Sequence, residues 1–525
     1  MASVNNRETQ RAELHKAIWN IADEVRGAVD GWDFKAYILC FLFYRFISED
    51  LVEYIDAGER EAGNPDFSYA DLSDEEAESA REGVTEERGY FILPSQLFQN
   101  IAKAPEKDKE LNIHVDEIFK AIEGSSVGYS SEKDFKGLFD DVDVTSNKLG
   151  ADLGERCERL SKIITGIRDL NFGSVRGADI DLFGDAYEYL MNMYASGAGK
   201  SGGEFFTPQE VSELLARIVV ADKTSVNKVY DPACGSGSLL LKFAKLLGTD
   251  NVRKGFYGQE INPTTYNLCR INMFLHHINF DRFHIARGDT LLDPKHWDDE
   301  PFDAIVSNPP YSVKWVGKDD ATLINDRRFS PAGVLAPKKY SDLAFTMHML
   351  SWLSSDGTAA IVEFPGVLYR GGAEAQIRQY LVDNNFVSAV IQLPANLFFG
   401  VTIATCVIVL SKSKGDDKTL FVDASELFGH EGNKNKLLPE HIEKIARTVI
   451  DRIEEEYFSK LVGADELGAE NSYNLSVSTW VEKRDTREKI DITELNARIK
   501  EIVAREQELR DSIDAIVADL EGEVD

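Results

Sequence analysis

Between Asp179 and Val422, short runs rich in β-branched residues alternate with stretches that have a helical pattern. Strands that alternate with helices are joined in parallel, and the helices then cover both faces of the sheet. Six of these runs end directly in a loop, and they read KVYDPACGSG, GFYGQEI, FDAIVSNPPY, GTAAIVEFP, VSAVIQLP and TCVIVLSK. The pattern predicts an α/β fold with a doubly wound, mostly parallel sheet.

The region before this sheet reads as helical, from about Thr9 to Leu170. Apolar residues recur three and four positions apart, as one face of a helix requires, at Leu14, Ile18, Ile21 and Val25. The segment YILCFLFYRFISEDLVEYI is apolar almost all round and predicts a buried helix. The charged residues within it argue against a membrane span.

The C-terminal region is helical again, and its apolar residues step by three and four. The stepped positions are Ile492, Leu495, Ile499, Ile502, Glu506, Leu509, Ile513, Ile516 and Leu520, of which only Glu506 is polar. A seam of this kind is typical of a coiled coil, so we expect a partner helix. The alternative is a helix that folds back on its own domain. We therefore expect three domains, at residues 1–170, 171–430 and 431–525.

The 525-residue chain carries a formal net charge of −32. Duplex binding relies on Lys and Arg to neutralise phosphates, so the acidic balance argues against a chain that coats nucleic acid. Any DNA binding needs a local basic surface or a basic partner. An acidic mimic of DNA is a weaker explanation, because it does not account for the ordered motifs described below.

The five cysteines are scattered, at Cys40, Cys157, Cys234, Cys269 and Cys406. The odd count and the absence of C-x-x-C argue against a disulfide framework or a zinc site, and we expect no bound metal. The first residues lack the apolar core of a secretory signal, and no run of about 18 apolar residues predicts a membrane span. We expect a cytoplasmic location.

The first strand runs into a glycine-rich turn that the helical stretch LLLKFAKLL follows. The turn comprises Asp231, Pro232, Ala233, Cys234, Gly235, Ser236 and Gly237. Glycines permit close approach of the backbone to a ligand, and free N–H groups at a helix start favour an anionic group. In a methyl-donor site that group is the carboxylate of a methionine moiety.

Acidic residues follow the next two strands. Glu260 lies 23 residues beyond Gly237, where a carboxylate can accept hydrogen bonds from both ribose hydroxyls of a cofactor. Asp289 follows the third strand, where it can accept from the adenine amino group of the donor. The alternatives are a surface acid at Glu260 and a turn-capping residue at Asp289.

The run FDAIVS leads into Asn308, Pro309, Pro310 and Tyr311. The prolines stiffen the loop. The Asn308 side-chain oxygen and the Pro309 carbonyl can together accept both hydrogens of an exocyclic amine, and Tyr311 offers an aromatic face to a flat substrate. A base inside a duplex cannot reach such a pocket and must be flipped out. The alternative is a proline-rich loop with an accidental asparagine.

DPACGSG followed by NPPY resembles the donor and catalytic motifs of amino-methyltransferases. The upstream run Gly202-Gly203-Glu204-Phe205-Phe206-Thr207-Pro208 resembles their additional donor-binding motif, and its position is similar to the gamma ordering of adenine-N6 enzymes. The resemblance implies a Rossmann-like domain dependent on S-adenosylmethionine. It also implies that Phe206, Thr207 and Pro208 line the methionine end of the donor, with Glu204 and Phe205 beside them.

The whole chain resembles the modification subunits of type I restriction-modification systems. The N-terminal run IADEVRGAVDGWDFKAYILCFLFYRFISE, the GVLYRGGAE run and YNLSVSTW before the last helix carry this resemblance. It implies double-stranded DNA as substrate and a separate specificity subunit that binds two methylase subunits through the C-terminal helix. It also implies an ATP-dependent restriction subunit as a further partner.

Two further features have competing interpretations. The family places a second aromatic for the flipped base late in the catalytic domain, and Phe398 or Phe399 is the candidate, although both are equally typical of a core. Basic residues follow NPPY and favour contact with DNA phosphates or a solvated loop. They are Lys314, Lys318, Arg327, Arg328, Lys338 and Lys339.

We therefore predict direct transfer of a methyl group to adenine N6, by positioning and polarisation and without a covalent enzyme intermediate. Cys234 has no basic partner in sequence, which disfavours a cytosine-C5 mechanism. Cytosine-N4 methylation uses the same polarisation and stays open, as do methylation of a protein glutamine and a donor-binding scaffold without activity.

Overall fold

The computed structural model describes residues 12–21, 33–172, 182–197, 207–432, 434–484 and 492–522. The chain forms two compact units, one that ends at Val481 and one that begins at Glu482. Across these described ranges, no helix combines the length and the apolar character that crossing a bilayer requires.

The N-terminal region is helical, as the periodicity predicts. Its α-helices are residues 12–21, α2 (Asp33–Glu61), α3 (Asp74–Ala77), α4 (Arg81–Arg88), α5 (Phe98–Ile101), α6 (Leu111–Ser125), α7 (Glu132–Phe135) and α8 (Leu153–Arg168). Short 3₁₀ turns lie at Tyr69–Asp71, Glu78–Ala80, Pro94–Gln96 and Pro105–Lys107. Leu14, Ile18 and Ile21 are buried, and α2 is buried from Tyr37 to Phe43 on every face, which confirms the prediction of a core helix. Val25 lies outside the described residues.

Nine strands of the described chain form one twisted sheet. They are β1 (Val229–Asp231), β2 (Phe256–Glu260), β3 (Phe283–Arg287), β4 (Phe302–Ser307), β5 (Leu353–Glu363), β6 (Val387–Gln392), β7 (Cys406–Ser411), β8 (Lys418–Asp423) and β11 (Ser459–Gly463). Their order is β11-β8-β6-β7-β5-β4-β1-β2-β3. β7 is antiparallel between β5 and β6, and β11 is antiparallel to β8, whereas the other pairs are parallel. The predicted doubly wound, mostly parallel sheet is confirmed.

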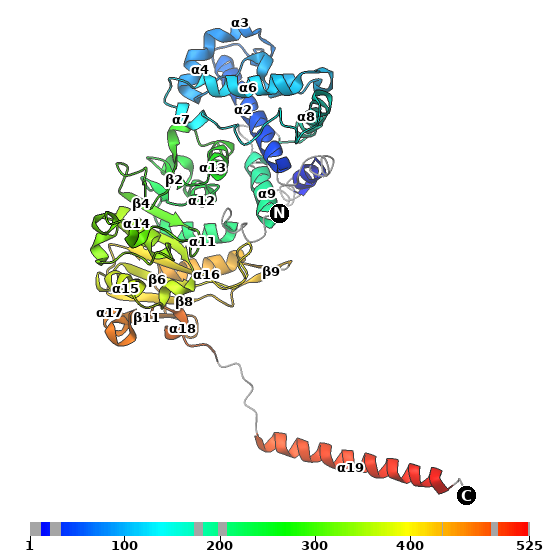
Figure 1. Cartoon of the computed structure of the whole chain (residues 1–525), viewed down its shortest axis with the longest axis vertical. Coiled ribbons are helices and arrows are strands. Elements are labelled where there is room, and N and C mark those ends of the chain that lie inside the picture. Colours follow the sequence, from blue (N-terminus) through cyan, green and yellow to red (C-terminus); the bar gives the residue numbers. More distant parts are fainter. Residues whose placement is uncertain are drawn as a thin grey trace. The chain divides into compact units, whose positions relative to one another are not determined.

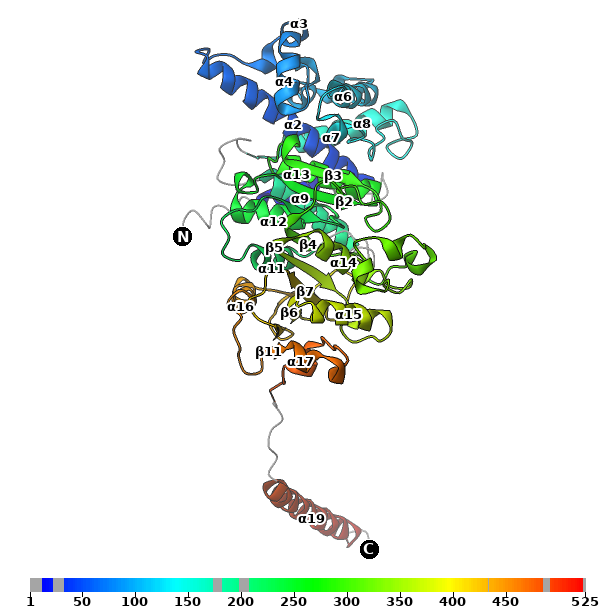
Figure 2. The same ribbon diagram turned by 90° about the vertical axis from the view of Figure 1, so that its left-hand side faces the viewer.

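Helices cover both faces of this sheet (Figures 1 and 2). They are α11 (Gln209–Val220), α12 (Ser238–Leu247), α13 (Pro263–Leu275), α14 (Asp342–Trp352), α15 (Ala373–Asp383), α16 (Pro439–Ile450), α17 (Ala464–Leu467) and α18 (Val477–Trp480), and α9 (Leu182–Gly197) packs between α13 and α2. Further 3₁₀ turns lie at Thr249–Asn251, Phe280–Arg282, Gly317–Asp319, Leu323–Asn325, Ser330–Ala332, Pro365–Leu368 and Ala469–Asn471, and a hairpin joins β9 (Gly429–Glu431) to β10 (Lys434–Lys436). Successive residues of β1 belong to two different hydrophobic cores. Val229 belongs to the core that contains residues of α11 and α12, and Tyr230 to the core that contains residues of α14 and α15.

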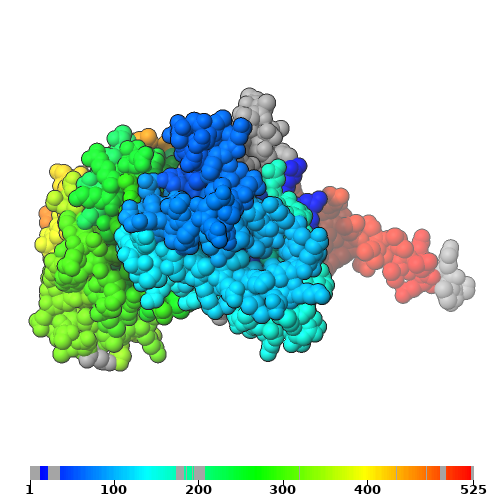
Figure 3. Space-filling view, turned by 90° about the horizontal axis from the view of Figure 1, so that it is seen from above, coloured from blue at the N-terminus to red at the C-terminus, as the bar shows by residue number. Residues whose placement is uncertain are grey.

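The N-terminal helices contact the sheet region through α13. Arg270 is buried, and its guanidinium donates hydrogen bonds to the carbonyls of Lys133, Asp134 and Lys136 at 3.0–3.2 Å. Asn267 on the same helix donates to the carbonyl of Gly137 at 3.1 Å. Figure 3 shows the N-terminal helices, in blue to cyan, packed against the green part of the sheet region. The two regions therefore form one compact unit.

The second unit contains α19 (Ile492–Gly522). The eight apolar positions of its predicted seam are 46–71% exposed. The long C-terminal helix is confirmed, and its apolar seam is open to solvent.

Candidate functional site

A cavity of about 290 Å³ lies where β1, β2, β3 and β4 end. Its lining residues are Pro232, Ala233, Gln259, Glu260, Ile261, Asn262, Gly288, Asp289, Thr290, Leu291, Asn308, Pro310, Val313, Lys314, Trp315, Ser341 and Phe345. The carboxyl ends of parallel strands meet at one edge of a sheet, and ligands bind in the crevice outside that edge. The cavity thus occupies the expected place for a cofactor, between the glycine-rich turn and the NPPY loop.

The glycine-rich turn fits closely against α13. Gly235 and Gly237 have positive φ angles of 53° and 80°. A Cβ atom on Gly237 would lie 2.8 Å from the Cys269 sulfur and 2.9 Å from the Met273 methyl carbon. Glycine at this position therefore satisfies both the backbone conformation and the space at the start of α12.

Asp231 links the turn after β1 to the end of β4. Its side chain is fully buried, and Oδ1 accepts hydrogen bonds from the Ala233 N–H at 3.0 Å and the Ser307 hydroxyl at 2.9 Å. Oδ2 has no hydrogen-bond partner among the described residues. Burial raises the pKa of Asp231 to about 7. Asp231 therefore acts here as a connection between two loops, rather than as part of the cavity lining.

Glu260 and Asp289 line the cavity at the ends of β2 and β3. The Glu260 carboxylate accepts from the Gly235 N–H at 3.1 Å and from the Asn262 N–H at 2.8 Å, and burial raises its pKa. Asp289 Oδ1 accepts from the Leu291 N–H at 2.9 Å. A carboxylate oxygen can accept more than one hydrogen bond, so these contacts orient both side chains without exhausting their capacity.

The amide of Asn308 is held from both sides. Its Nδ2 donates to the Thr207 hydroxyl at 3.1 Å, and its Oδ1 accepts from the Tyr311 hydroxyl at 2.5 Å. The Tyr311 ring lies 6.0 Å from that of Phe364 and 6.2 Å, edge-on, from that of Phe398. Since Oδ1 has two lone pairs, it can accept a second hydrogen bond from a substrate amine.

The backbone beyond Tyr311 is fixed by the start of α14. Ser312 has a φ of 54°, a left-handed conformation that is uncommon for residues other than glycine. Its N–H donates to the buried carboxylate of Asp342 at 3.1 Å, and the Ser341 N–H donates to the Val313 carbonyl at 3.0 Å. These bonds direct Val313 and the following residues over the cavity.

The residues predicted from the motifs fall into three groups. Those that line the cavity are Pro232, Ala233, Glu260, Asp289, Asn308 and Pro310. Those that are linked to the lining residues by sequence or by a hydrogen bond are Asp231, Gly235, Ser236, Gly237, Pro309, Tyr311 and Thr207, with Pro208, which lines a separate cavity. Glu204, Phe205 and Phe206 lie outside the described residues.

The two late aromatic candidates differ in their surroundings. Phe398 is 1% exposed and contacts Tyr311. Phe399 is half-buried, with the Lys434 ammonium 2.9 Å from its ring centroid, and it lines a second cavity of about 510 Å³ together with Pro208. The described structure brings neither ring face to face with Tyr311.

Several functional contacts were missed from the sequence. The residues that support or line the site without having been predicted are Ser307, Thr290, Trp315 and Phe345. Only Ser307 could have been found from the sequence, because it directly precedes the NPPY motif. The prediction that the basic residues after NPPY contact DNA phosphates is wrong for Arg328, because this side chain is 1% exposed and cannot face DNA. Its guanidinium is fully engaged inside the protein.

Cys234 is buried beside Cys269. The hydrogen bond between the two thiols, 3.9 Å from sulfur to sulfur, and burial raise the pKa of Cys234 well above its usual value. A thiol is nucleophilic as its thiolate, so this environment is unsuited to nucleophilic attack. All five cysteines are free and buried.

The chain is similar to known proteins along most of its length. The family model described as N-6 DNA Methylase matches residues 178–489, and that of the HsdM N-terminal domain matches residues 14–167. The chain is 47% identical to the type I restriction enzyme MpnII methylase subunit of Mycoplasma pneumoniae, over 99% of this chain and 98% of that protein. It is 29% identical to the MjaVII methylase subunit of Methanocaldococcus jannaschii, over 94% and 82%. The crystal structure of the type I restriction-modification methyltransferase subunit from Streptococcus thermophilus matches with a TM-score of 0.81 at 32% identity, over 90% of this chain and 100% of that one.

The raised pKa of Asp231 predicts a pH-dependent stability. An unfolded Asp ionises near pH 4, whereas Asp231 keeps its proton to about pH 7 in the folded chain. The folded state therefore binds more protons between these values, and the free energy of unfolding falls as the pH rises through this window. Asp231→Asn removes this contribution, so its unfolding free energy, measured in urea from pH 5.5 to 7.5, should fall less steeply than that of the unmodified chain. Equal slopes would contradict the prediction.

Proposed function

Because the chain belongs to the N-6 DNA methylase family, among the methylase subunits of type I restriction enzymes, we propose that its NPPY loop directs methyl transfer to the N6 amino group of an adenine in DNA. The observation that carries the proposal is the position of Asn308. Its side chain lines the cavity between the glycine-rich turn and the NPPY loop, and Thr207 and Tyr311 orient its amide.

The cavity residues fit S-adenosylmethionine. Glu260, at the end of β2, offers a carboxylate to ribose hydroxyls, and Asp289, at the end of β3, offers one to an adenine amino group. Leu291 and Phe345 supply apolar surface for a flat ring. The close fit of Gly237 against Cys269 of α13 fixes the turn that supplies Pro232 and Ala233 to the cavity. When bound, S-adenosylmethionine supplies a methyl group on a positively charged sulfur.

The protein's own contribution is to position and polarise the amine. Asn308 Oδ1 and the Pro309 carbonyl accept the two amine hydrogens, which increases the sp3 character of the nitrogen and orients its lone pair. The Asn308 amide cannot rotate freely, because Nδ2 is bonded to Thr207 and Oδ1 to Tyr311. Acceptors that are oriented before the reaction need no reorganisation during it, which is the main source of electrostatic catalysis.

The target adenine is flipped out of the duplex and stacks on aromatic rings. Tyr311 is the first of these, since it belongs to the NPPY loop. We assign the second to Phe399, because it lines an open cavity next to Pro208, whereas Phe398 is enclosed by the core. Lys434 must leave the face of the Phe399 ring before a base can stack there.

A basic rim lies beside the cavity and fits the phosphates of duplex DNA. It consists of Lys314, which lines the cavity, Lys338, whose carbonyl accepts from the Trp315 N–H at 3.1 Å, and Lys339 and Arg370 beside Tyr340. The Arg370 guanidinium lies 4.1 Å and the Lys339 ammonium 5.1 Å from the Tyr340 ring centroid. Lys314 lines the cavity, as does Ser341, the neighbour of Tyr340. This local positive charge offsets the net charge of −32 where the substrate approaches.

The open seam of α19 supports a partner helix. A row of apolar side chains at coiled-coil spacing favours helix-on-helix pairing. We assign this seam to a DNA-specificity subunit that binds two copies of this chain, and an ATP-dependent restriction subunit completes the complex. A reducing cytoplasm fits the five free cysteines.

Asn308→Ala should abolish most of the activity while it preserves donor binding. Loss of one oriented polar group at a reacting centre lowers turnover about 10²–10³-fold. Turnover is measured with the specificity subunit and substrate DNA, and the methylated nucleoside is identified by mass spectrometry. Asn325→Ala, at an exposed asparagine of the same loop region, is the matched control. N4-methylcytosine as the product would overturn the assignment of the base, and donor binding without product would favour the scaffold alternative.

Lys339→Gln should weaken DNA binding for all sequences to a similar degree. The plot of log affinity against log salt concentration has a negative slope, and each lost phosphate contact reduces its magnitude by about 0.9. Affinity of the complex is measured by fluorescence anisotropy at several salt concentrations. Lys254→Gln, at the opposite end of the sheet before β2, is the control. Equal slopes for the two variants would place the DNA elsewhere.

Ile513→Asp should disrupt assembly with the specificity subunit, because it places a charge in the seam of α19. Ala515→Asp introduces the same charge outside the seam and should leave assembly intact. Both variants are compared by co-elution with the co-expressed specificity subunit, and donor binding checks that the catalytic region is unaffected. Loss of assembly in both variants, or in neither, would contradict a partner at the seam.

A further inference from the structure

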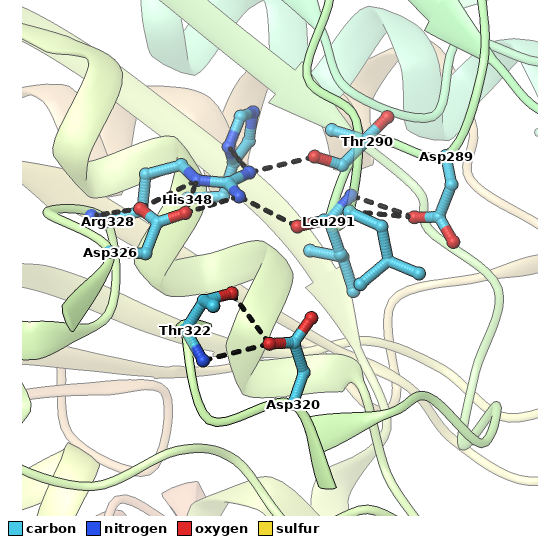
Figure 4. A network of polar contacts seen from close by, with 9 residues as sticks. Asp289, Thr290, Leu291, Asp320, Thr322, Asp326, Arg328 and His348 are labelled. Atoms are coloured by element: carbon cyan, nitrogen blue, oxygen red, sulfur yellow. Dashed lines mark hydrogen bonds and ion pairs between the residues drawn. The ribbon is translucent and has the colours of Figure 1, made fainter. Parts of the chain in front are cut away.

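Arg328 is a buried cation in the segment between the NPPY loop and α14. It is 1% exposed and donates to the Thr290 carbonyl at 2.8 Å and the Leu291 carbonyl at 2.7 Å (Figure 4). The Asp326 carboxylate receives further hydrogen bonds at 2.8–3.1 Å. A guanidinium buried in this way requires a full set of acceptors, and Arg328 has them.

The network continues through His348 to the strand that bears the glycine-rich turn. The Arg328 guanidinium lies 3.2 Å from His348 Nδ1. Arginine can only donate, so Nδ1 accepts and the imidazole is neutral, in agreement with a His348 pKa that burial lowers well below its usual value. The proton then resides on Nε2, which donates to the Tyr230 hydroxyl at 3.0 Å. Tyr230 directly precedes Asp231.

The two carbonyls that Arg328 holds belong to residues that line the donor cavity. The Leu291 N–H orients the Asp289 carboxylate, and the Thr290 hydroxyl donates to the Pro232 carbonyl at 2.6 Å, within the glycine-rich turn. The segment that carries Arg328 also contributes Val313, Lys314 and Trp315 to the lining of the cavity. One guanidinium therefore joins the elements that surround the donor.

We propose that Arg328 is a positioning residue for the methyl donor. Its guanidinium fixes the loop that carries Asp289 against the segment between the NPPY loop and α14, which lines part of the cavity. Arg328 touches no substrate, and its effect is transmitted through the Thr290 and Leu291 carbonyls. This inference rests on the proposed binding of S-adenosylmethionine in this cavity. Holding both carbonyls at once requires the forked geometry of a guanidinium, since a lysine ammonium is a single point donor.

The test measures the dissociation constant of S-adenosylmethionine by isothermal titration calorimetry, with the full-length chain. Arg328→Met should raise that constant roughly ten- to hundredfold, the range typical of residues that orient the contacts of a site. Arg328→Lys should fall between Arg328→Met and the unmodified chain. DNA affinity should change much less than donor affinity.

Arg378→Met is the matched control for the loss of a buried arginine. Arg378 is also buried and donates to two main-chain carbonyls, those of Val367 and Tyr473, neither of which lines the cavity. Both Met variants should lower the melting temperature, but only Arg328→Met should weaken donor binding. An unchanged dissociation constant in a folded Arg328→Met variant would overturn the proposal. If this variant does not fold, Arg328→Lys decides by the same criterion.

The outcome is distinguishable from a failure of the proposed function. If the unmodified chain does not bind S-adenosylmethionine, the cavity assignment fails and the inference fails with it. If the unmodified chain binds the donor, Asp289→Asn weakens binding and Arg328→Met does not, the cavity assignment stands and the role of Arg328 is rejected.

Discussion

The parallel pairing of β1 with β2 on one side and β4 on the other is the constraint on which the site depends. It brings the glycine-rich turn, Glu260 and the NPPY loop to one edge of the sheet, although they are separated by tens of residues in sequence. The hydrogen bond from the Ser307 hydroxyl to Asp231 then links the strand that ends in the turn to the strand that ends in the catalytic loop. Because Asp231 is fully buried, this link is shielded from water and fixes the spacing between the glycine-rich turn and the NPPY loop.

Much of this arrangement could be predicted from the sequence, because its signals are local. Each predicted strand is a short apolar run, and the turn and NPPY motif follow their strands directly. The contacts that hold Asn308 were not predictable in the same way, since Thr207 lies 101 positions away and is brought near only by the fold. Arg328 was wrongly predicted to face DNA phosphates, because a basic residue in a polar loop suggests solvent exposure. Its partners, the carbonyls of Thr290 and Leu291, are brought near only by the fold. The insertion of β7 between β5 and β6 likewise depends on long-range pairing rather than on local composition.

The distribution of charge separates the tasks of the molecule. Acidic residues outnumber basic ones, 90 to 58, and positive charge near the site is divided between the exposed lysines of the basic rim and the buried guanidinium of Arg328. We propose that the former bind DNA phosphates and that the latter positions the loops of the cavity. The exposed seam of α19 adds a third surface, and in the proposed function donor, DNA and partner each meet a different part of the chain.

We propose that this chain, with its specificity subunit, methylates adenine at N6. Long-read sequencing of a methylation-free host that expresses both chains tests it most directly, with each chain alone and Asn308→Ala as controls. We expect N6-methyladenine at a defined site of two separated parts, and no mark in any control. N4-methylcytosine, or the absence of a mark although the two chains co-purify and bind S-adenosylmethionine, would contradict it.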